Sequence, residues 1–550
     1  MSARASQTPD RAAFIEGSGS GTVSWASISR QADDLANRLG PAGEHRRVGL
    51  VVDGATQFCA TYLAALACGY CVAPLDPRAT QEELRVQVTQ LELTDILLDA
   101  PMAGLAGALL GTGVEAFGVG ELGRSGALGR SGALGRSGAL AWRRPTGGRP
   151  DQRAGAAEHR RHPAGTAVLL RTSGSTGQPK LIPLTQSQLL HNASQVVAHH
   201  GLGVHDRGYC PLPLFHINAQ VVGVLSTLVA GSSLVVDRRL PKDRFWATVL
   251  RSKANWLNLV PAILSVATDL FEAWASSTSS SDARGLSERV RFARSASSPL
   301  ADPIRVRFEA TTGISVLETY GMTEAAGQIT ANPLRSADRR AGSVGLPVGV
   351  MLRVVEDGSR PALPQTKASQ PNGTGHRIAD PGEVGAVEIN GPSVIDRYLA
   401  PGGERDAQPA RTTDGWLRTG DLAWRDADGY VYLVGRTDDV INRGGEKLYP
   451  AEIESVLLRD PRVEAAVAVG RPHHSLGAEP VAFVVPKPDW SRAPEGPCLV
   501  DDLHLACATS LSYYKRPVEI TVAASLPTSS TGKLQRKALA RELANGAGAR

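Results

Sequence analysis

Residues 172–180 read Thr-Ser-Gly-Ser-Thr-Gly-Gln-Pro-Lys, and this stretch says more about the architecture of the chain than any other. Its small hydroxyls and unobstructed backbone N–H groups can approach the oxygens of a polyphosphate closely. It follows the apolar run 167–171, which is typical of a β-strand. The spacing of Gly174 and Gly177 differs from that of the common P-loop, in which four residues separate the two glycines. We therefore expect a phosphate-binding loop of another class, placed at the end of a strand in an α/β protein.

Short apolar runs and helical patterns alternate on both sides of this loop. The runs at 47–52, 95–98 and 233–236 are typical of buried strands, and Ala- and Leu-rich segments lie between them. This alternation predicts an α/β domain with a largely parallel sheet. From about residue 380, alternating runs such as 385–389 and 430–434 indicate antiparallel strands instead. After Arg436 the remaining residues are numerous enough for a small domain of their own.

A repeat interrupts the first part of the chain. Gly-Arg-Ser-Gly-Ala-Leu occurs three times in tandem from Gly123 to Leu140, with flanks over roughly 101–163 that are rich in Gly, Arg and Pro. A six-residue unit with two glycines cannot build a core, and three copies are too few for a solenoid. We expect a flexible surface insertion without chemistry here, and a smaller one in the Ser-rich stretch 276–282.

Composition narrows the classes of partner and compartment. The 59 Lys and Arg against 54 Asp and Glu give a net charge of +5, which does not predict a nucleic-acid partner. The start of the chain lacks the apolar segment of a signal peptide, and no stretch approaches the roughly 20 apolar residues that span a bilayer. We expect a cytoplasmic protein without a membrane partner. Cys68 and Cys71 lie in an apolar run and are expected to be buried, inert thiols.

Five further motifs follow the loop in a characteristic order. They are Leu-Glu-Thr-Tyr-Gly-Met-Thr-Glu-Ala at 317–325, Gly-Trp-Leu-Arg-Thr-Gly-Asp-Leu at 415–422, Gly-Arg-Thr-Asp-Asp-Val-Ile-Asn at 435–442, Gly-Gly-Glu-Lys-Leu-Tyr-Pro-Ala-Glu-Ile-Glu at 444–454, and Pro-Thr-Ser-Ser-Thr-Gly-Lys-Leu-Gln-Arg-Lys at 527–537. Together with the loop, this set resembles the adenylate-forming superfamily, which contains acyl-CoA synthetases, amino-acid adenylation domains and luciferases. The resemblance covers nearly the whole chain outside the insertions.

The resemblance implies an α/β fold in two domains. The large N-terminal domain, 1–435, would combine packed α/β sheets with a small β-barrel-like part. The small α+β C-terminal domain, 436–550, would be mobile and would carry the catalytic lysine. Asp438 would be the hinge between them, and rotation there would exchange Lys533 for the Gly444–Gly445 loop. Such a rotation would let one site run two half-reactions.

The resemblance also implies a role for each motif residue with ATP and Mg²⁺. Catalysis would be positioning and charge neutralisation, because a carboxylate must attack an anionic α-phosphate. Tyr320 would stack on adenine, Asp421 would accept from the ribose hydroxyls, and Arg436 would reach ribose and phosphate. Thr323 would bind the α-phosphate, Glu324 would hold Mg²⁺, and Lys533 would bridge the carboxylate and the α-phosphate. The β- and γ-phosphates would be held by Thr172, Ser173, Gly174, Ser175, Thr176, Gly177 and Lys180, and Gly445 and Lys447 would lie near the thiol nucleotide.

The segment 213–220, Pro-Leu-Phe-His-Ile-Asn-Ala-Gln, bears on the identity of the acid. Amino-acid adenylation domains carry an Asp where this chain has His216, which argues against an α-amino acid. His216 would instead gate the thiol tunnel, with a core histidine as the alternative. The acid pocket would be lined by His216, Asn218, Gln220, Ser295 and Gly321. An unpaired buried polar group costs about 1–3 kcal/mol, so this pocket favours a small or polar acid over a long fatty chain.

These patterns predict an AMP-forming ligase that joins a small-molecule acid to CoA, most similar to the oxalate–CoA ligase branch. One alternative is a CoA-independent enzyme of the same fold, for example a diazotase that activates nitrite for coupling to an aryl amine. A second alternative, a catalytically silent binding protein, would be expected to lack Lys533, Glu324 or Asp421, and all three are present. The sequence leaves the oligomeric state open.

Overall fold

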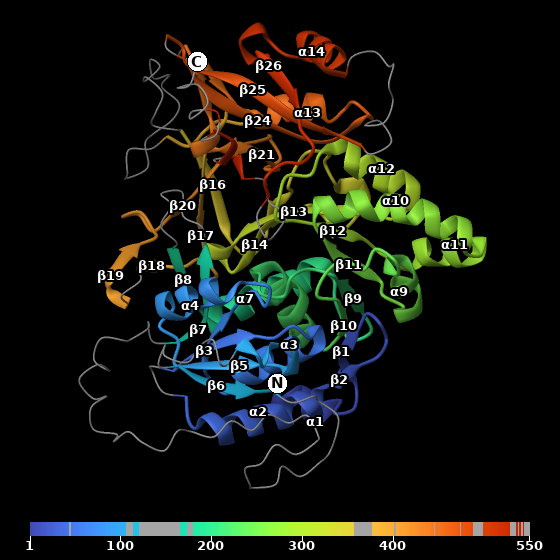
Figure 1. Ribbon diagram of the computed structural model, residues 1–550, viewed down its shortest axis with the longest axis vertical. Helices are drawn as coiled ribbons and strands as arrows, with labels where there is room; N and C mark the ends of the chain where they lie inside the picture. The colour runs from blue at the N-terminus through green and yellow to red at the C-terminus, as the bar shows by residue number, and fades with distance from the viewer. Residues whose placement is uncertain are drawn as a thin grey trace.

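The structure is a computed structural model of the chain, shown in Figure 1. It describes residues 1–42, 46–105, 114–119, 165–172, 180–356, 377–400, 403–444, 446–473, 475–487, 499–528, 535, 536, 538–540 and 543. The tandem repeat therefore lies outside the described residues.

The largest described sheet has nine strands in the order β15-β14-β13-β12-β11-β9-β10-β1-β2. They are β1 (Ala12–Glu16), β2 (Thr22–Ser24), β9 (Arg207–Cys210), β10 (Ser233–Val236), β11 (Trp256–Leu259), β12 (Ala293–Ser295), β13 (Val316–Met322), β14 (Gly327–Ala331) and β15 (Leu346–Pro347). From β1 to β13 neighbouring strands in this order run parallel. Their carboxyl ends therefore meet at one edge, where open α/β sheets bind their ligands.

A second sheet of eight described strands has the order β19-β18-β8-β7-β4-β3-β5-β6. They are β3 (Arg47–Val51), β4 (Cys71–Pro74), β5 (Asp95–Leu98), β6 (Glu115–Gly118), β7 (Thr166–Thr172), β8 (Lys180–Thr185), β18 (Arg397–Ala400) and β19 (Gly403–Pro409). Strand β6 falls within the stretch expected to be an insertion and extends the sheet in parallel with β5. The first part of that stretch therefore belongs to the folded domain.

Helices cover both sheets because successive residues of each strand point to opposite faces. Leu234 and Val236 join the core cluster shared with the second sheet, whereas Val235 faces the other way. Between the sheets lie α2 (Trp25–Leu39), α3 (Ala55–Ala67), α7 (Gln186–His200), η3 (Ala219–Leu225) and α8 (Ser226–Ala230). The outer face of the nine-stranded sheet carries α9 (Phe245–Ser252), α10 (Pro261–Ser277), α11 (Ser280–Arg289) and α12 (Asp302–Thr312), and that of the second sheet carries α4 (Gln81–Gln90). The short α1 (Ser2–Gln7) precedes β1.

Helix α7 shows how local sequence sets an element of the central layer. The Thr185 hydroxyl accepts from the Gln188 backbone N–H at 3.2 Å, and the Gln188 side chain accepts from the Thr185 N–H at 2.8 Å. This reciprocal cap starts the helix directly after β8. Gly201 ends it with a φ of 57°, a left-handed conformation that favours glycine. The helix consequently runs back between the two sheets.

The remaining strands form two further sheets. A four-stranded antiparallel sheet contains β16 (Met351–Val355), β17 (Gly385–Asn390), β20 (Leu417–Arg425) and β21 (Val431–Arg436). It is the part that the sequence predicted to be barrel-like, and it packs on the same core as the two large sheets. The last sheet contains β22 (Ile441–Arg443), β23 (Glu446–Leu448), β24 (Val463–His473), β25 (Gly477–Pro486) and β26 (Glu519–Val522), with α13 (Pro450–Leu457) and α14 (Leu499–Ser510) on one face. The predicted α/β class with a large N-terminal and a smaller C-terminal part is confirmed.

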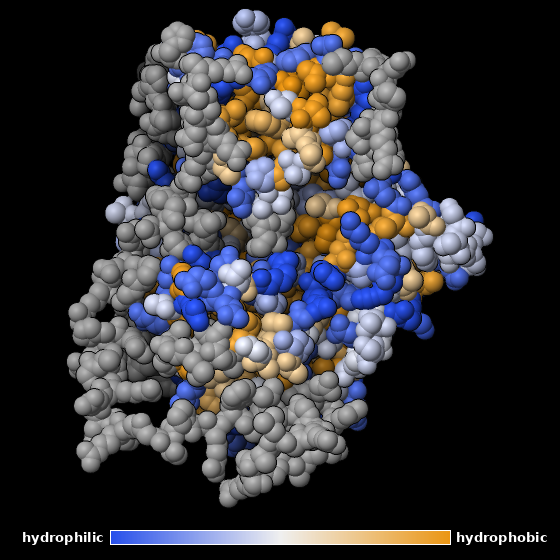
Figure 2. Space-filling view, in the orientation of Figure 1, coloured by the Kyte–Doolittle hydropathy of each residue, from blue (hydrophilic) through white to orange (hydrophobic). Residues whose placement is uncertain are grey.

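The surface differs between these parts. Figure 2 shows apolar residues gathered on the part of this face that carries the last sheet, above a belt of hydrophilic residues at the height of α4 and α7. Leu505 and Tyr513 are among the most exposed large apolar side chains there, at 66% and 77%. Within the described residues, no helix is both long and apolar enough to cross a bilayer. Cys71 is buried in β4, and burial raises the pKa of its thiol to about 12, as expected of an inert cysteine.

Candidate active site

The phosphate loop joins two antiparallel strands. Strand β7 ends at Thr172 and β8 begins at Lys180, and these two residues are cross-strand partners. The expected position of the loop at the end of a strand is thus confirmed. The loop's own candidates, Ser173, Gly174, Ser175, Thr176 and Gly177, lie outside the described residues.

Lys180 and Glu324 both contact Tyr398, an aromatic side chain that the sequence analysis did not identify. Its ammonium is 4.5 Å from the centre of the Tyr398 ring, and the Tyr398 hydroxyl donates to Glu324 at 3.3 Å. Tyr398 comes from β18, which pairs with β8 at Leu181. Three separate segments therefore bring a cation, a phenol and a carboxylate to one place.

Glu324 is placed to hold a cation. Burial raises the pKa of its carboxyl above the ordinary value, while the Tyr398 hydroxyl and the charges of Lys180 and Arg436 oppose that rise. In the part of the chain that the structure describes, no group of three or more metal-binding side chains occurs. Mg²⁺ usually takes one or two carboxylates together with substrate phosphates. A half-buried carboxylate near Lys180, where β8 begins, fits that pattern.

Tyr320, Asp421 and Arg436 form a second group. The Tyr320 hydroxyl donates to one Asp421 oxygen at 2.5 Å, and Arg436 donates to the other at 3.1 Å. Asp421 and Arg436 are cross-strand partners in β20 and β21, whereas Tyr320 comes from β13 of the nine-stranded sheet. The structure thus brings together three residues predicted to contact the adenosine part of ATP.

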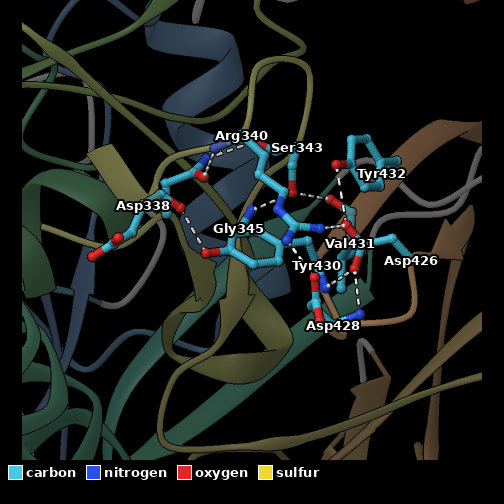
Figure 3. Close-up of polar contacts among 10 residues, drawn as sticks. Asp338, Arg340, Ser343, Gly345, Asp426, Asp428, Tyr430, Val431 and Tyr432 are labelled. Carbon is cyan, nitrogen blue, oxygen red and sulfur yellow. Dashed lines mark hydrogen bonds and ion pairs between the residues drawn. The ribbon is translucent and has the colours of Figure 1, made fainter. Parts of the chain in front are cut away.

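A polar clamp joins the two sheets that carry this group (Figure 3). Arg340, in the loop after β14, forms ion pairs with Asp426 and Asp428 in the β20–β21 turn and stacks 4.2 Å from the centre of the Tyr430 ring. The Tyr430 hydroxyl donates to the Asp338 carbonyl at 2.6 Å. These contacts hold the turn after Asp421 against the sheet that carries Tyr320.

The motif 317–325 turns sharply at its end. Thr323 and Glu324 lie in the 3-10 turn η4 (Thr323–Ala325), and Ala326 follows with a φ of 56°. A side chain at Gly321 would place its Cβ 2.1 Å from the Gly327 carbonyl oxygen, so only glycine fits there. The close approach of β13 and β14 therefore fixes the position of the turn that carries Thr323 and Glu324.

His216 is mostly buried at the start of the acid-pocket segment. Its ring centre lies 4.2 Å from that of Phe215, and its Nε2 has no hydrogen-bond partner within the described structure. Burial lowers the pKa of the His216 imidazole to about 4. The charge of Asp76 raises this pKa, and the charge of Arg78 lowers it further. His216 is therefore neutral at pH 7.

The remaining pocket candidates converge on a buried arginine that the sequence interpretation missed. Asn218 accepts from Arg294 at 2.9 Å, and Ser295 follows Arg294 on β12. Gln220 is fully buried and accepts from the Tyr62 hydroxyl at 3.4 Å, so it lies deeper, against α3. The Ser295 hydroxyl and the Gln220 amide nitrogen lack partners among the described side chains and backbone.

The C-terminal candidates are less fully described. Lys533 and Gly445 lie outside the described residues. Lys447 is half-buried on β23, next to α13, and Asp438 is exposed in η6 (Thr437–Asp439). The sheets change at this point: β21 ends at Arg436 in the four-stranded sheet, and β22 begins at Ile441 in the last one.

Two residues were missed for different reasons. Tyr398 stands in a short run with no recognisable spacing, so nothing in the sequence distinguishes it from a core aromatic. Arg294 gave only a weak signal, because it is one of three arginines in the segment 289–294, Arg-Val-Arg-Phe-Ala-Arg, that leads to Ser295. A charge inside a run of this kind is worth following, since buried charges are rare unless paired.

Comparison with known proteins agrees with this geometry. Residues 1–399 match the family described as AMP-binding enzyme, and residues 452–533 match its C-terminal domain. The sulfoacetate–CoA ligase of Cupriavidus necator is 40% identical over 68% of this chain and 66% of that enzyme. The oxalate–CoA ligase of Arabidopsis thaliana is 33% identical over 70% of this chain and 69% of that enzyme. The matched stretches thus span about two thirds of each relative.

Among solved structures, ATP-bound MatB from Rhodopseudomonas palustris superposes with a TM-score of 0.76 at 25% identity, covering 98% of this chain and 96% of that one. That coverage includes both the large part and the last sheet. The match to the AMP-binding enzyme family extends over more than half of the chain. This protein therefore belongs to the AMP-binding enzymes, the adenylate-forming superfamily that its motifs resemble.

Proposed function

We propose that this protein is an AMP-forming ligase that activates a small, polar acid with ATP and transfers the acyl group to CoA. In the first step the acid's carboxylate attacks the α-phosphate, an acyl-adenylate forms and pyrophosphate leaves. In the second step the thiol attacks the acyl carbon and AMP leaves. The ligase relatives, named for sulfoacetate and oxalate, support this assignment. They give no support to nitrite activation, the alternative that the sequence left open.

The observation that carries the proposal is the convergence of Lys180, Glu324 and the Tyr320–Asp421–Arg436 group around the carboxyl edge of the sheets. The two anions that react must be held together against their repulsion, so cationic side chains are needed on the phosphates. Lys180 and Arg436 supply positive charge, and Asp421 offers acceptors to the ribose. Glu324 would hold Mg²⁺, which would neutralise phosphate charge when bound.

A cavity lined by Phe215, the residue before His216, suits the thiol nucleotide. It has a volume of about 260 Å³ and is lined by Phe215, Arg78, Arg238 and Arg239, among others. Arg78 and Arg238 pair with Asp76 and Asp53, and Arg239 adds a further positive charge beside the aromatic ring, a combination that would suit the phosphates and the base of CoA. His216, adjacent to Phe215, would separate this cavity from the acid. Because His216 is neutral at pH 7, it would act there as a gate and would carry no charge.

The second step requires the thiol to reach the acyl carbon. We place the hinge at Asp438, in the connection between β21 and β22. Rotation of residues 436–550 about this point would remove Lys533 after adenylation and bring Gly445 and Lys447 toward the thiol. ATP and CoA are substrates of the cytoplasm, where we place the reaction.

Pyrophosphate release and thioester formation test the proposal. The assay would cover a panel of small acids with ATP and Mg²⁺, with and without CoA, and nitrite with an aryl amine. We expect Lys533→Ala to lose adenylation while ATP binding, measured by calorimetry, persists. Lys242→Ala serves as the control, because it removes an exposed lysine that is distant in sequence from Lys533. Near-normal pyrophosphate release by Lys533→Ala would contradict the assigned role, and turnover of nitrite alone would contradict the proposed reaction.

A further inference from the structure

Arg294 is a buried arginine without a countercharge. Its side chain is 2% exposed in the middle of the nine-stranded sheet. Its guanidinium donates to the Asn218 and Asn258 carbonyl oxygens at 2.9 and 3.2 Å and to the Gln328 carbonyl oxygen at 3.4 Å. No carboxylate forms an ion pair with it within the described residues, and its Nε has no partner there. All of its side-chain acceptors are therefore neutral amides.

The buried Arg353 and Arg47 and the half-buried Arg339 are satisfied in different ways. Arg353 contacts the carboxylates of Glu388 and Asp414, each at 2.6 Å. Arg47 contacts Glu92 at 3.2 Å, and Arg339 donates to three backbone carbonyls. Burying an unpaired charge costs free energy. A buried arginine without a carboxylate partner therefore indicates that a bound ligand supplies the anion. In agreement, burial lowers the pKa of the Arg294 guanidinium to about 9.

The surroundings of Arg294 are also incomplete. The Gln328 amide nitrogen and the Ser295 hydroxyl lack hydrogen-bond partners among the described residues, and both belong to side chains no more than 2% exposed. Polar groups this deeply buried are normally paired. The Gln328 amide and the Ser295 hydroxyl can donate hydrogen bonds next to the Arg294 guanidinium. Such a set of donors suits an anion with several oxygens.

This cluster adjoins the place where the acid is activated. Gln328 is the direct cross-strand partner of Gly321, which precedes Thr323 and Glu324. Asn218 lies two residues after His216, and its amide nitrogen donates to the exposed Ser297 at 3.4 Å. Ser297 has a φ of 75°, an uncommon conformation for a residue other than glycine and one that is frequent at functional sites. Asn218 thus lies between the surface turn and the buried guanidinium.

We propose that Arg294 binds a second anionic group, a carboxylate or a sulfonate, at the far end of the short acid whose first carboxylate is adenylated. This inference rests on the proposed acid activation and specifies its substrate class. The planar guanidinium pairs with such a group through two parallel hydrogen bonds. The neutral amides hold the guanidinium in place without cancelling its charge. A monoacid of the same size would leave that charge unpaired beside an alkyl group.

Matched pairs of acids test the substrate class. Sulfoacetate and malonate would be compared with propionate and butyrate, and oxalate with acetate, by pyrophosphate release at saturating ATP. We expect the dianionic member of at least one pair to be preferred by about 100-fold or more in kcat/KM, the range measured when a buried charge loses its partner. Equal turnover of both members in every pair would overturn the proposal while leaving acid activation intact. Turnover of no acid at all would count against the proposed function instead.

Two variants then test the residue. Arg294→Met should lower kcat/KM for the dianionic acid about 100-fold relative to its monoacid partner, a selective loss that a general folding defect would not produce. Asn218→Asp should have the same effect on the preference, because it places a carboxylate within reach of the guanidinium and keeps the site filled. Arg291→Met is the control. Arg291 lies three residues before Arg294 and forms an ion pair with Asp206, and its removal should retain the preference for dianionic acids.

A binding measurement separates recognition from catalysis. Calorimetry of sulfoacetate in the presence of AMP should give binding to the wild-type protein and a loss of about 100-fold in affinity for Arg294→Met and Asn218→Asp. If both variants retained the wild-type affinity and the preference for dianions, Arg294 would be a structural residue only, and the proposal would fail.

Discussion

Arg353 and Arg294 are both buried arginines on β-strands, yet their surroundings are opposite. Arg353, on β16, is held by Glu388 and Asp414, and Arg418 contacts the second oxygen of Glu388 at 2.9 Å. Among the described residues, Arg294 on β12 donates to the amide oxygens of Asn218, Asn258 and Gln328 and to no carboxylate. The charge of Arg353 is thus paired with carboxylates of the chain, whereas that of Arg294 has no such partner among the described residues.

The difference separates residues that hold the fold from residues that await a ligand. A buried charge that only stabilises the fold, such as that of Arg353, is best paired with carboxylates of the same chain. A pocket charge with a built-in partner would have no capacity left for substrate. Proteins break the rule of satisfied burial mainly at functional sites, at a cost in stability. His216, Ser295 and Arg294 each have a buried polar atom without a hydrogen-bond partner among the described residues.

The largest effect on stability is expected from breaking the framework pair. Glu388→Ala would remove the buried carboxylate that both Arg353 and Arg418 contact. Removing one member of a buried ion pair costs about 3–5 kcal/mol. Urea denaturation, followed by intrinsic fluorescence, should show the first transition at a lower denaturant concentration. Glu82→Ala, on the exposed face of α4, is the matched control. An unchanged midpoint would show that this pair does not support the framework.

A pH series addresses the unpaired imidazole of the pocket. The pKa of His216 is about 4 when folded, against an ordinary 6.5, so the unfolded state takes up a proton first as the pH falls. His216 therefore costs stability progressively between pH 6.5 and 4 and costs none above that window. In His216→Phe this loss, up to about 3 kcal/mol, should disappear. The same slope of stability against pH in both proteins would show that the imidazole titrates normally.

Removing the pocket arginine should leave the ligand-free protein about as stable as before. Arg294→Met replaces an uncompensated buried charge by an apolar side chain of similar length, a kind of change that is often neutral or stabilising. We expect the unfolding free energy to stay within about 1 kcal/mol of wild type or to rise. A loss as large as that of Glu388→Ala would show that both arginines serve the framework and would erase the contrast between them.

The smallest effect is expected at the surface clamp of Figure 3. Arg340 is 38% exposed, so water screens its ion pairs with Asp426 and Asp428. Arg340→Met should shift the melting temperature only slightly and leave the choice among acids unchanged. An altered preference between dianionic and monoanionic acids would mean that the clamp reaches the pocket.

Much of the framework could be predicted from local sequence. The strands at Asp95–Leu98 and Ser233–Val236 have the bounds that their apolar runs indicated. The Ser-rich stretch 276–282 was predicted wrongly as an insertion: it covers the end of α10 and the start of α11, where the Ser279 hydroxyl accepts from the Asp282 N–H at 3.1 Å. Serine is frequent in loops and at helix caps alike, so composition alone could not separate the two.

The pocket was harder to predict because its members are distant in the chain. Asn258, Arg294 and Gln328 belong to three strands, and only the sheet register places them together. Motif resemblance locates residues that touch ATP, which all such enzymes share. It does not locate the residues that recognise the acid, because they differ with the acid and carry no shared pattern.

The close approach at Gly321 has a consequence for engineering this enzyme. Because even a methyl group there would collide with the backbone at Gly327, the wall of the pocket on that side cannot be moved by substitution. Asn218 and Asn258, which accept hydrogen bonds from Arg294, are side chains whose size and polarity can change without moving a strand. Libraries that seek new acids should therefore vary those two positions together with Arg294 and leave Gly321 untouched.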